Sequence, residues 1–114
     1  MKRFFFLIVI FLIISPQIKA AELISVNFKQ EKETSVLEMF FDENEVQANK
    51  FQVTEDKQII IDLKNVKAKE KVIRGFDTSE FSGSIVYVSA YTKPGHGGDL
   101  RIALQLRDNV RSIL

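Results

Sequence analysis

The chain has 114 residues, with 16 Lys and Arg against 15 Asp and Glu, one histidine, and no cysteine or tryptophan. This length allows one small domain, and the lack of cysteine excludes disulfides, thiolate metal sites and cysteine nucleophiles. A formal net charge of +1 argues against binding to nucleic acid, which normally requires a clear basic excess.

The first twenty residues have the layout of a secretory signal peptide. A short positive head, residues 1–3, precedes residues 4–14, which are all apolar. A Ser-Pro pair then ends the apolar run, and small residues around Ala20 offer a cleavage site. A membrane-spanning helix needs about 20 apolar residues, so this run is too short for a firm anchor. We predict a signal peptide over residues 1–20; an uncleaved anchoring helix is the alternative.

The mature chain, residues 21–114, contains no linker or repeat and is predicted to be one domain. Loss of Lys2, Arg3 and Lys19 leaves 13 basic and 15 acidic residues, so its net charge is −2. A faintly acidic exported domain has no electrostatic reason to bind nucleic acid or anionic lipid. We predict an exported protein that has no membrane span once the leader is removed.

Alternation of apolar and polar residues with period two dominates the mature chain and predicts half-buried β-strands. Near residue 50, for example, Phe51 and Val53 alternate with Lys50 and Gln52. Residues 59–63 read Ile-Ile-Ile-Asp-Leu, an apolar run that predicts a strand covered on both faces. The six predicted strands are residues 23–28, 36–41, 50–54, 59–63, 84–92 and 100–107.

Turn-forming segments separate these strands. Residues 93–99 contain one proline and three glycines and predict a hairpin turn. Residues 67–71 carry charges of both signs and read as a solvated connector, and residues 78–81 suit one helical turn. Further polar turns are expected at residues 30–33, 42–47 and 55–57. Six short, evenly spaced strands predict an all-β protein, an antiparallel sandwich or barrel.

Few groups in the chain suit catalysis. His96 lies in the glycine-rich turn, which indicates a hairpin rather than a metal ligand. The neighbouring carboxylates at residues 42–43 and 55–56 lie in turns and point apart, unlike the facing pair of a glycoside hydrolase. The sequence has no Gly-x-Ser-x-Gly nucleophile elbow. We therefore predict no catalytic residues, no metal and no cofactor.

Asp62 and Arg101 each lie inside an otherwise apolar predicted strand. A buried carboxylate needs a partner, and Arg101 is the natural candidate. Two interpretations stay open at this point. Asp62 has a structural role, in an ion pair or as an acceptor of backbone N–H groups, or Arg101 reaches the surface and meets an anionic ligand.

Four segments together resemble the AMIN domain. They are an opening strand after the leader, a hydrophobic strand ending in Asp-Leu, a strand before a glycine-containing hairpin, and an Arg-bearing alternating strand, at residues 23–28, 59–63, 85–88 and 100–106. The likeness covers residues 22–107. AMIN domains occur in periplasmic N-acetylmuramoyl-L-alanine amidases and near the N-terminus of type IV pilus secretins. The secretin form is the closer match, because of the leader and the hairpin spacing.

The resemblance implies a small antiparallel β-sandwich without catalytic activity that binds peptidoglycan. It also implies a location in the periplasm, in association with the cell wall or outer membrane, and a secretin or other envelope protein as partner. The family usually continues past the Arg-bearing strand with a final hairpin, whereas this sequence ends at Leu114. We therefore expect residues 21–114 to lack that hairpin and one sandwich edge to be less covered.

The polar face of the last two predicted strands is the candidate binding surface. Tyrosine rings are flat platforms for sugars, and guanidinium groups suit the carboxylates of stem peptides; peptidoglycan contains both. An ordinary solvated sheet face is the alternative. The candidate residues are Arg101, Gln105, Arg107, Tyr87 and Tyr91, with Arg74 as an addition from a loop.

The favoured function is a non-catalytic peptidoglycan-binding module that supports a type IV pilus secretin or a similar envelope machine. The alternative is a protein–protein interaction module that acts by edge-strand addition. A small periplasmic enzyme is the third hypothesis, and the missing nucleophile, metal and cofactor motifs argue against it.

Overall fold

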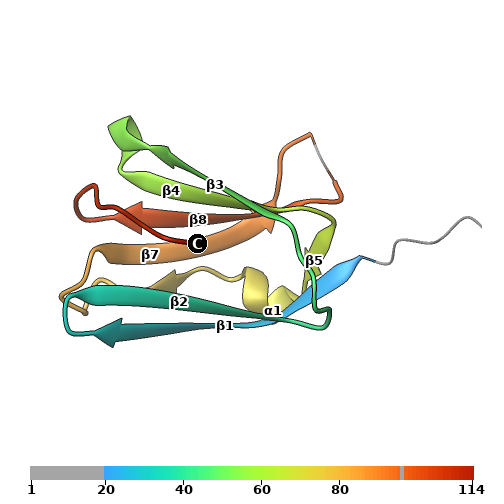
Figure 1. Cartoon of the computed structure of the whole chain (residues 1–114), viewed down its shortest axis with the longest axis horizontal. Coiled ribbons are helices and arrows are strands. Elements are labelled where there is room, and N and C mark those ends of the chain that lie inside the picture. The colour runs from blue at the N-terminus through green and yellow to red at the C-terminus, as the bar shows by residue number, and fades with distance from the viewer. Residues whose placement is uncertain (1–19, 96) are drawn as a thin grey trace, which may run out of the picture.

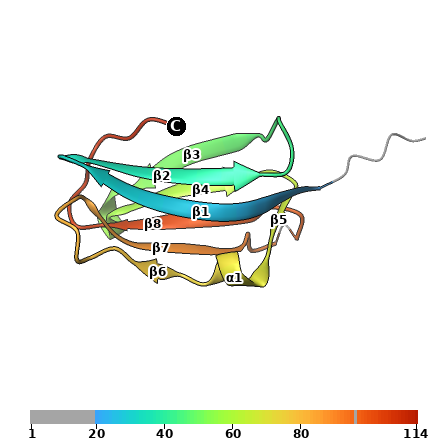
Figure 2. The ribbon, with the colours of Figure 1, turned by 90° about the horizontal axis from the view of Figure 1, so that it is seen from below.

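The computed structural model describes residues 20–95 and 97–114, which form two β-sheets packed face to face (Figure 1, Figure 2). The predicted signal peptide falls on residues 1–19, outside this part apart from Ala20. The smaller sheet has the order β2-β1-β5, with β1 (Ala21–Glu31), β2 (Thr34–Phe41) and β5 (Val66–Ala68). The larger sheet has the order β3-β4-β8-β7-β6, with β3 (Ala48–Val53), β4 (Gln58–Leu63), β8 (Leu100–Leu106), β7 (Ile85–Thr92) and β6 (Phe76–Asp77).

All six predicted strands are present, and the predicted all-β fold class is confirmed. The short strands β5 and β6 are additional. β5 occupies part of residues 67–71, so the prediction of a solvated connector is wrong there. Three residues are too few to show an alternating pattern, and β5 depends instead on its parallel pairing with the start of β1. A short helix, α1 (Glu70–Ile73), follows it.

The helical turn expected at residues 78–81 is a non-helical turn, and the short helix lies earlier in the chain, at α1. Thr78 explains the difference because it is buried and anchored. Its Oγ1 donates a hydrogen bond to the carbonyl oxygen of Ile85 over 2.6 Å, and its own carbonyl accepts one from the Phe81 N–H over 3.0 Å. The segment is therefore tied to the start of β7.

The core lies between the two sheets, and the central strands β4 and β8 supply much of it. Successive side chains of a strand point to opposite faces, so alternate residues of these strands enter the core. Ile60 points the other way, to the side of the sheet that the second sheet does not cover, and is nevertheless buried. The prediction that residues 59–63 are covered on both faces therefore holds at Ile60 but not at Asp62, which is partly exposed. The inward residues of the two strands are Ile59, Ile61, Leu63, Leu100, Ile102, Leu104 and Leu106.

Several connections are tight turns at the predicted places. Lys32 and Lys57 adopt positive φ values of 58° and 54° in the β1–β2 and β3–β4 connections. In the second of these, a 3-10 turn (Thr54–Asp56) precedes Lys57. The β7–β8 hairpin is closed by a hydrogen bond from the Lys93 N–H to the Asp99 carbonyl oxygen, 2.9 Å long. His96, which the sequence analysis assigned to this turn, lies outside the described residues.

The apolar side of β3 faces away from the core. Lys50 points between the sheets, and Phe51 lies on the opposite face beside Ile60 of β4. β3 is the end strand of its sheet, so its inner side borders the open side of the sandwich and tolerates a lysine. The alternation in this strand therefore marks a second, outward-facing apolar surface.

Residues 107–114, here called the tail, follow β8 without forming a strand. They cross the side of the sandwich at which the end strands β2 and β3 lie (Figure 2). Within the described part of the chain, no helix is long and apolar enough to cross a membrane.

Candidate functional site

The outward side of the larger sheet, here called the outer face, consists of three rows of side chains that cross four strands. Each row follows the pairing of β3, β4, β8 and β7, and successive rows are two residues apart along every strand. In that strand order the rows are Asn49, Asp62, Arg101 and Tyr91; Phe51, Ile60, Ala103 and Ser89; and Val53, Gln58, Gln105 and Tyr87.

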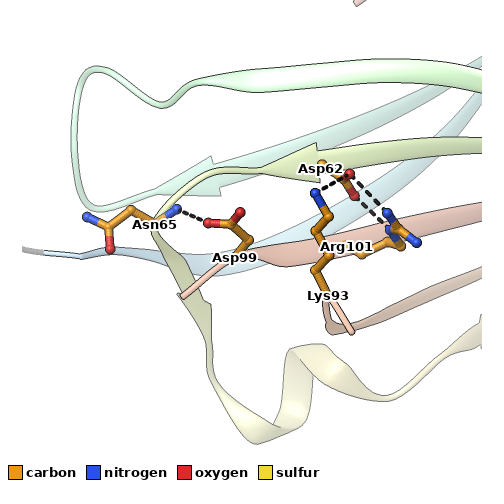
Figure 3. Close-up of polar contacts among 5 residues, drawn as sticks. All are labelled: Asp62, Asn65, Lys93, Asp99 and Arg101. Atoms are coloured by element: carbon orange, nitrogen blue, oxygen red, sulfur yellow. Dashed lines mark hydrogen bonds and ion pairs between the residues drawn. The ribbon is translucent and has the colours of Figure 1, made fainter. Parts of the chain in front are cut away.

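An ion cluster occupies the first row (Figure 3). The Arg101 guanidinium donates two hydrogen bonds to the Asp62 carboxylate, from Nε over 2.8 Å and from Nη2 over 3.1 Å. Lys93 approaches the same carboxylate, with its Nζ 3.4 Å from Oδ2. The Asp62 side chain is only 11% exposed, so this contact replaces most of its hydration. Asp62 and Arg101 thus form the pair expected from their positions.

The cluster changes the protonation equilibria of its members. The hydrogen bond from Arg101 lowers the pKa of Asp62 below its ordinary value of 3.8, although burial acts in the opposite direction. The same bond raises the pKa of Arg101, and Tyr91 beside it acts in the same direction. Asp62 is therefore ionised at neutral pH, and two cations share one carboxylate. This end of the outer face carries an excess positive charge.

Three aromatic side chains lie on the outer face, Phe51 and Tyr91 beside this cluster and Tyr87 two rows away. Phe51, Tyr87 and Tyr91 are 40%, 43% and 38% exposed, so each ring has one free side. The Arg101 guanidinium carbon lies 5.7 Å from the centre of the Phe51 ring, within the range of a cation–π contact. Arg101 is thus held from two directions, by a carboxylate and by an aromatic ring.

Gln105 in the third row has a structural role. Its Nε2 donates to the carbonyl oxygens of Asp56 and Lys57, over 3.0 Å and 3.1 Å, and its Oε1 accepts from Gln58 over 3.3 Å. These contacts tie the β3–β4 turn to β8. The amide is only partly exposed, which leaves it at the border of the outer face.

Tyr87 rests on the loop that carries Arg74. A Cβ atom placed on Gly75 would lie 2.7 Å from Cε2 and Cζ of the Tyr87 ring and still closer to its hydroxyl. The ring therefore packs directly on the Gly75 backbone, and only glycine leaves room for it. This contact brings the loop bearing Arg74 to the edge of the outer face.

Changing Gly75 to Ala is expected to displace the Tyr87 ring while the chemistry of every other group on the face stays the same. Because Tyr87 is half-exposed and rotates into solvent, the free energy of unfolding is expected to fall by less than about 1 kcal/mol. NMR resonances of the Tyr87 ring and denaturant melts measure the two effects. An unmoved Tyr87 ring would show that the contact with Gly75 is absent in solution.

Arg107 lies just beyond β8, and its guanidinium is hydrogen-bonded to the β6–β7 loop. It donates hydrogen bonds to three backbone carbonyl oxygens, those of Phe81 over 3.0 Å, Ser79 over 3.3 Å and Gly83 over 3.4 Å. The structure therefore places Arg107 at the end of the sheet, away from the Asp62–Arg101 cluster. Its contribution to ligand binding stays a prediction.

Sequence reasoning missed two contributors to this face, Phe51 and Lys93. Phe51 was expected to point into the core, because the apolar side of a strand usually does. Lys93 has a signal in the sequence, because it continues the outward series Tyr87, Ser89 and Tyr91 at a spacing of two. It was assigned only to the turn.

The fold is a two-sheet sandwich, and its outer face combines half-exposed aromatic rings with a held guanidinium, which are groups suited to binding a ligand. The AMIN domain family model matches residues 25–113, well over half of the chain. The chain therefore belongs to the AMIN family, and the resemblance seen in the sequence is confirmed. AMIN domains are in general peptidoglycan-binding or targeting modules of periplasmic proteins, and they bind rather than catalyse. No curated protein and no solved structure matches this chain.

Proposed function

We propose that the outer face binds peptidoglycan and that this protein is a non-catalytic, exported module that attaches to the cell wall. The observation that carries the proposal is that three half-exposed aromatic rings share one sheet face with Arg101, with Phe51 and Tyr91 beside it and Tyr87 two rows away. Family membership supports it, since AMIN domains generally have this role. Aromatic faces pack against the apolar faces of sugar rings, and the excess positive charge suits the carboxylates of stem peptides.

Each residue of the face has a distinct role in this proposal. Tyr87, Tyr91 and Phe51 provide the platforms for the glycan. Arg101, held by Asp62, offers its charge to a stem-peptide carboxylate, and Lys93 adds to that charge. Gln105, Arg74 and Arg107 stand at the border and contact the ligand only where it extends past the platforms.

Replacing Tyr87 and Tyr91 together with Ala is expected to reduce retention on purified sacculi by at least about tenfold, because each ring contributes roughly 1 kcal/mol or more. Co-sedimentation with sacculi measures the retained fraction. The matched control is Phe40→Ala, since Phe40 is a similarly exposed aromatic residue of β2, in the other sheet. Equal retention of the double variant, the control and the unchanged protein would contradict the proposed face.

The proposed setting is the periplasm, at the cell wall or outer membrane, in support of a type IV pilus secretin or a similar machine. The closeness of the sequence to the secretin form of the domain favours this setting. Cross-linking in intact cells tests it: recovery of a secretin supports the link, and recovery of other envelope proteins alone argues against it.

A further inference from the structure

An apolar groove opens between the two sheets on the side where β2 and β3 lie. Its volume is about 440 Å³, and the tail forms part of its lining. This space is large enough for several apolar side chains. The walls come from both sheets and include Leu37 and Met39 of β2, Ile59 and Ile61 of β4, and Leu104 and Leu106 of β8.

The strands on either side of this groove are sheet edges. β2 ends the smaller sheet and β3 ends the larger one, so within residues 20–95 and 97–114 each has one side with no neighbouring strand. An edge strand presents a row of N–H and C=O groups that can pair with another extended chain. The groove therefore combines an apolar floor with backbone hydrogen-bonding groups at its rim.

The tail already follows the path of an added strand. Asn109 Nδ2 donates to the Thr54 carbonyl oxygen over 3.1 Å, and Ser112 accepts hydrogen bonds from Lys50, so the tail runs antiparallel to β3. No backbone hydrogen bond joins the tail to β3, both of which the structure describes. Ile113 is 93% exposed, so this apolar side chain does not fill the groove. The tail is thus held by Val110, which packs against the hydrophobic core, and by side-chain hydrogen bonds, without strand pairing to β3.

Lys50 gives the groove a charge preference. Its side chain points between the sheets, and Nζ donates to the Ser112 carbonyl oxygen over 2.6 Å and to Ser112 Oγ over 2.9 Å. Both acceptors are neutral, and Lys50 forms no ion pair with any described carboxylate. A partly buried ammonium group is satisfied better by a carboxylate than by neutral oxygens.

We propose that the groove is an acceptor site for an extended segment of a partner protein, which displaces the tail and pairs with the edge of β3. The segment has apolar residues at alternate positions, which enter the groove, and an acidic residue opposite Lys50. A fatty acid has the same combination of an apolar chain and an acidic head, but it cannot pair with the backbone of β3. The edge strands therefore favour a polypeptide.

Selection of random short peptides on the purified protein tests this proposal. The unchanged protein is expected to enrich peptides with alternating apolar residues and one Asp or Glu. A Lys50→Glu variant is expected to enrich Lys or Arg at that position, and Lys50→Gln is expected to bind the acidic peptides about tenfold less tightly. Enrichment that ignores the charge at residue 50, in variants whose melting curves show a folded protein, overturns the proposal.

The location of binding is checked by hydrogen exchange. The selected peptide is expected to slow exchange of β3 amides and to leave those of β7 unchanged. Replacing Asn109 and Ser112 with Ala loosens the tail and is expected to raise peptide affinity several-fold, whereas unchanged affinity contradicts displacement of the tail. Tight binding of a fatty acid, without protection of β3, overturns the proposal in favour of a lipid site. Retention on sacculi is expected to be the same in all these variants, so failure here is distinguishable from failure of the outer face.

Discussion

Replacing Asp62 with Ala is expected to lower the free energy of unfolding by about 2 kcal/mol, because it leaves Arg101 and Lys93 side by side without their shared carboxylate. The Asp62 side chain is 11% exposed and the Arg101 side chain 22%, so solvent only partly replaces the lost contact. A deeply buried pair costs more when it is broken, and access of water to Lys93 reduces the effect here. Denaturant unfolding followed by circular dichroism measures the change.

The control for this variant is Glu38→Gln. Glu38 pairs with Lys29 over 3.3 Å in the other sheet, but the two side chains are much more exposed. Exposed ion pairs contribute little, so a loss below about 0.5 kcal/mol is expected. If the two variants lose equal stability, the Asp62 cluster has no special role in the fold.

The same carboxylate makes stability depend on pH in the acid range. Arg101 holds the pKa of Asp62 below its ordinary value of 3.8, which is close to its value in the unfolded chain. The contribution of Asp62 is therefore complete above about pH 4 and is lost as pH falls through the folded-state pKa. We expect the stability difference between the unchanged protein and Asp62→Asn to be constant near neutral pH and to shrink in acid. A difference that grows below pH 4 would have the wrong sign.

Replacing Ile102 with Ala is expected to have the largest effect, a loss of about 3 to 4 kcal/mol in the free energy of unfolding. Ile102 is fully buried at the centre of β8, between β4 and β7 and facing the smaller sheet. Few neighbours there can move to fill the space, so the cavity adds to the lost burial. A small domain without disulfides has a low free energy of unfolding, so thermal melts are expected to show a large decrease in melting temperature.

Ile60 provides a matched comparison for Ile102. It is nearly as buried, but it lies on the outer face, outside the core between the sheets. Side chains near the surface move more easily to fill a cavity. Ile60→Ala is therefore expected to lower the free energy of unfolding by about half as much as Ile102→Ala. Because Ile60 lies beside Phe51, this variant is also expected to weaken sacculus binding, whereas a folded Ile102 variant should bind normally. Equal losses of stability would mean that the outer face packs as tightly as the core.

The two proposed surfaces share one strand. Phe51 of β3 points to the outer face, and Lys50, the preceding residue, points into the groove. Because neighbouring residues of a strand face opposite sides, a ligand on one surface does not block the other. Under the two proposals, the domain therefore binds the wall and a partner segment at the same time.

Much of the architecture was predictable from local pattern. Period-two alternation located five of the eight strands and a continuous apolar run located β4, and the turns at residues 30–33, 55–57 and 93–99 followed from their residue types. The two missed strands, β5 and β6, are three and two residues long. Strands of that length have no readable period, and they form only because a longer neighbour offers its edge.

The candidate site was predictable only in part. Spacing along β7 and β8 placed Tyr87, Tyr91, Arg101 and Gln105 on one side of two strands. The bonds from Gln105 to the β3–β4 turn and from Arg107 to the β6–β7 loop join segments distant in the chain. Local pattern carries no information about such contacts.

The amino-acid sequence by itself determined that this is a small all-β domain, because alternation and turn chemistry act over a few neighbouring residues, and four of its segments carried the resemblance to the AMIN domain. Only the tertiary structure decided which side of β3 faces the core, which charged groups surround Asp62, and that a groove lies between the sheets beneath the tail. Each of these depends on strands that meet across long stretches of chain. The packing of these strands determines which face of each strand is buried, which the alternation of apolar and polar residues alone does not determine.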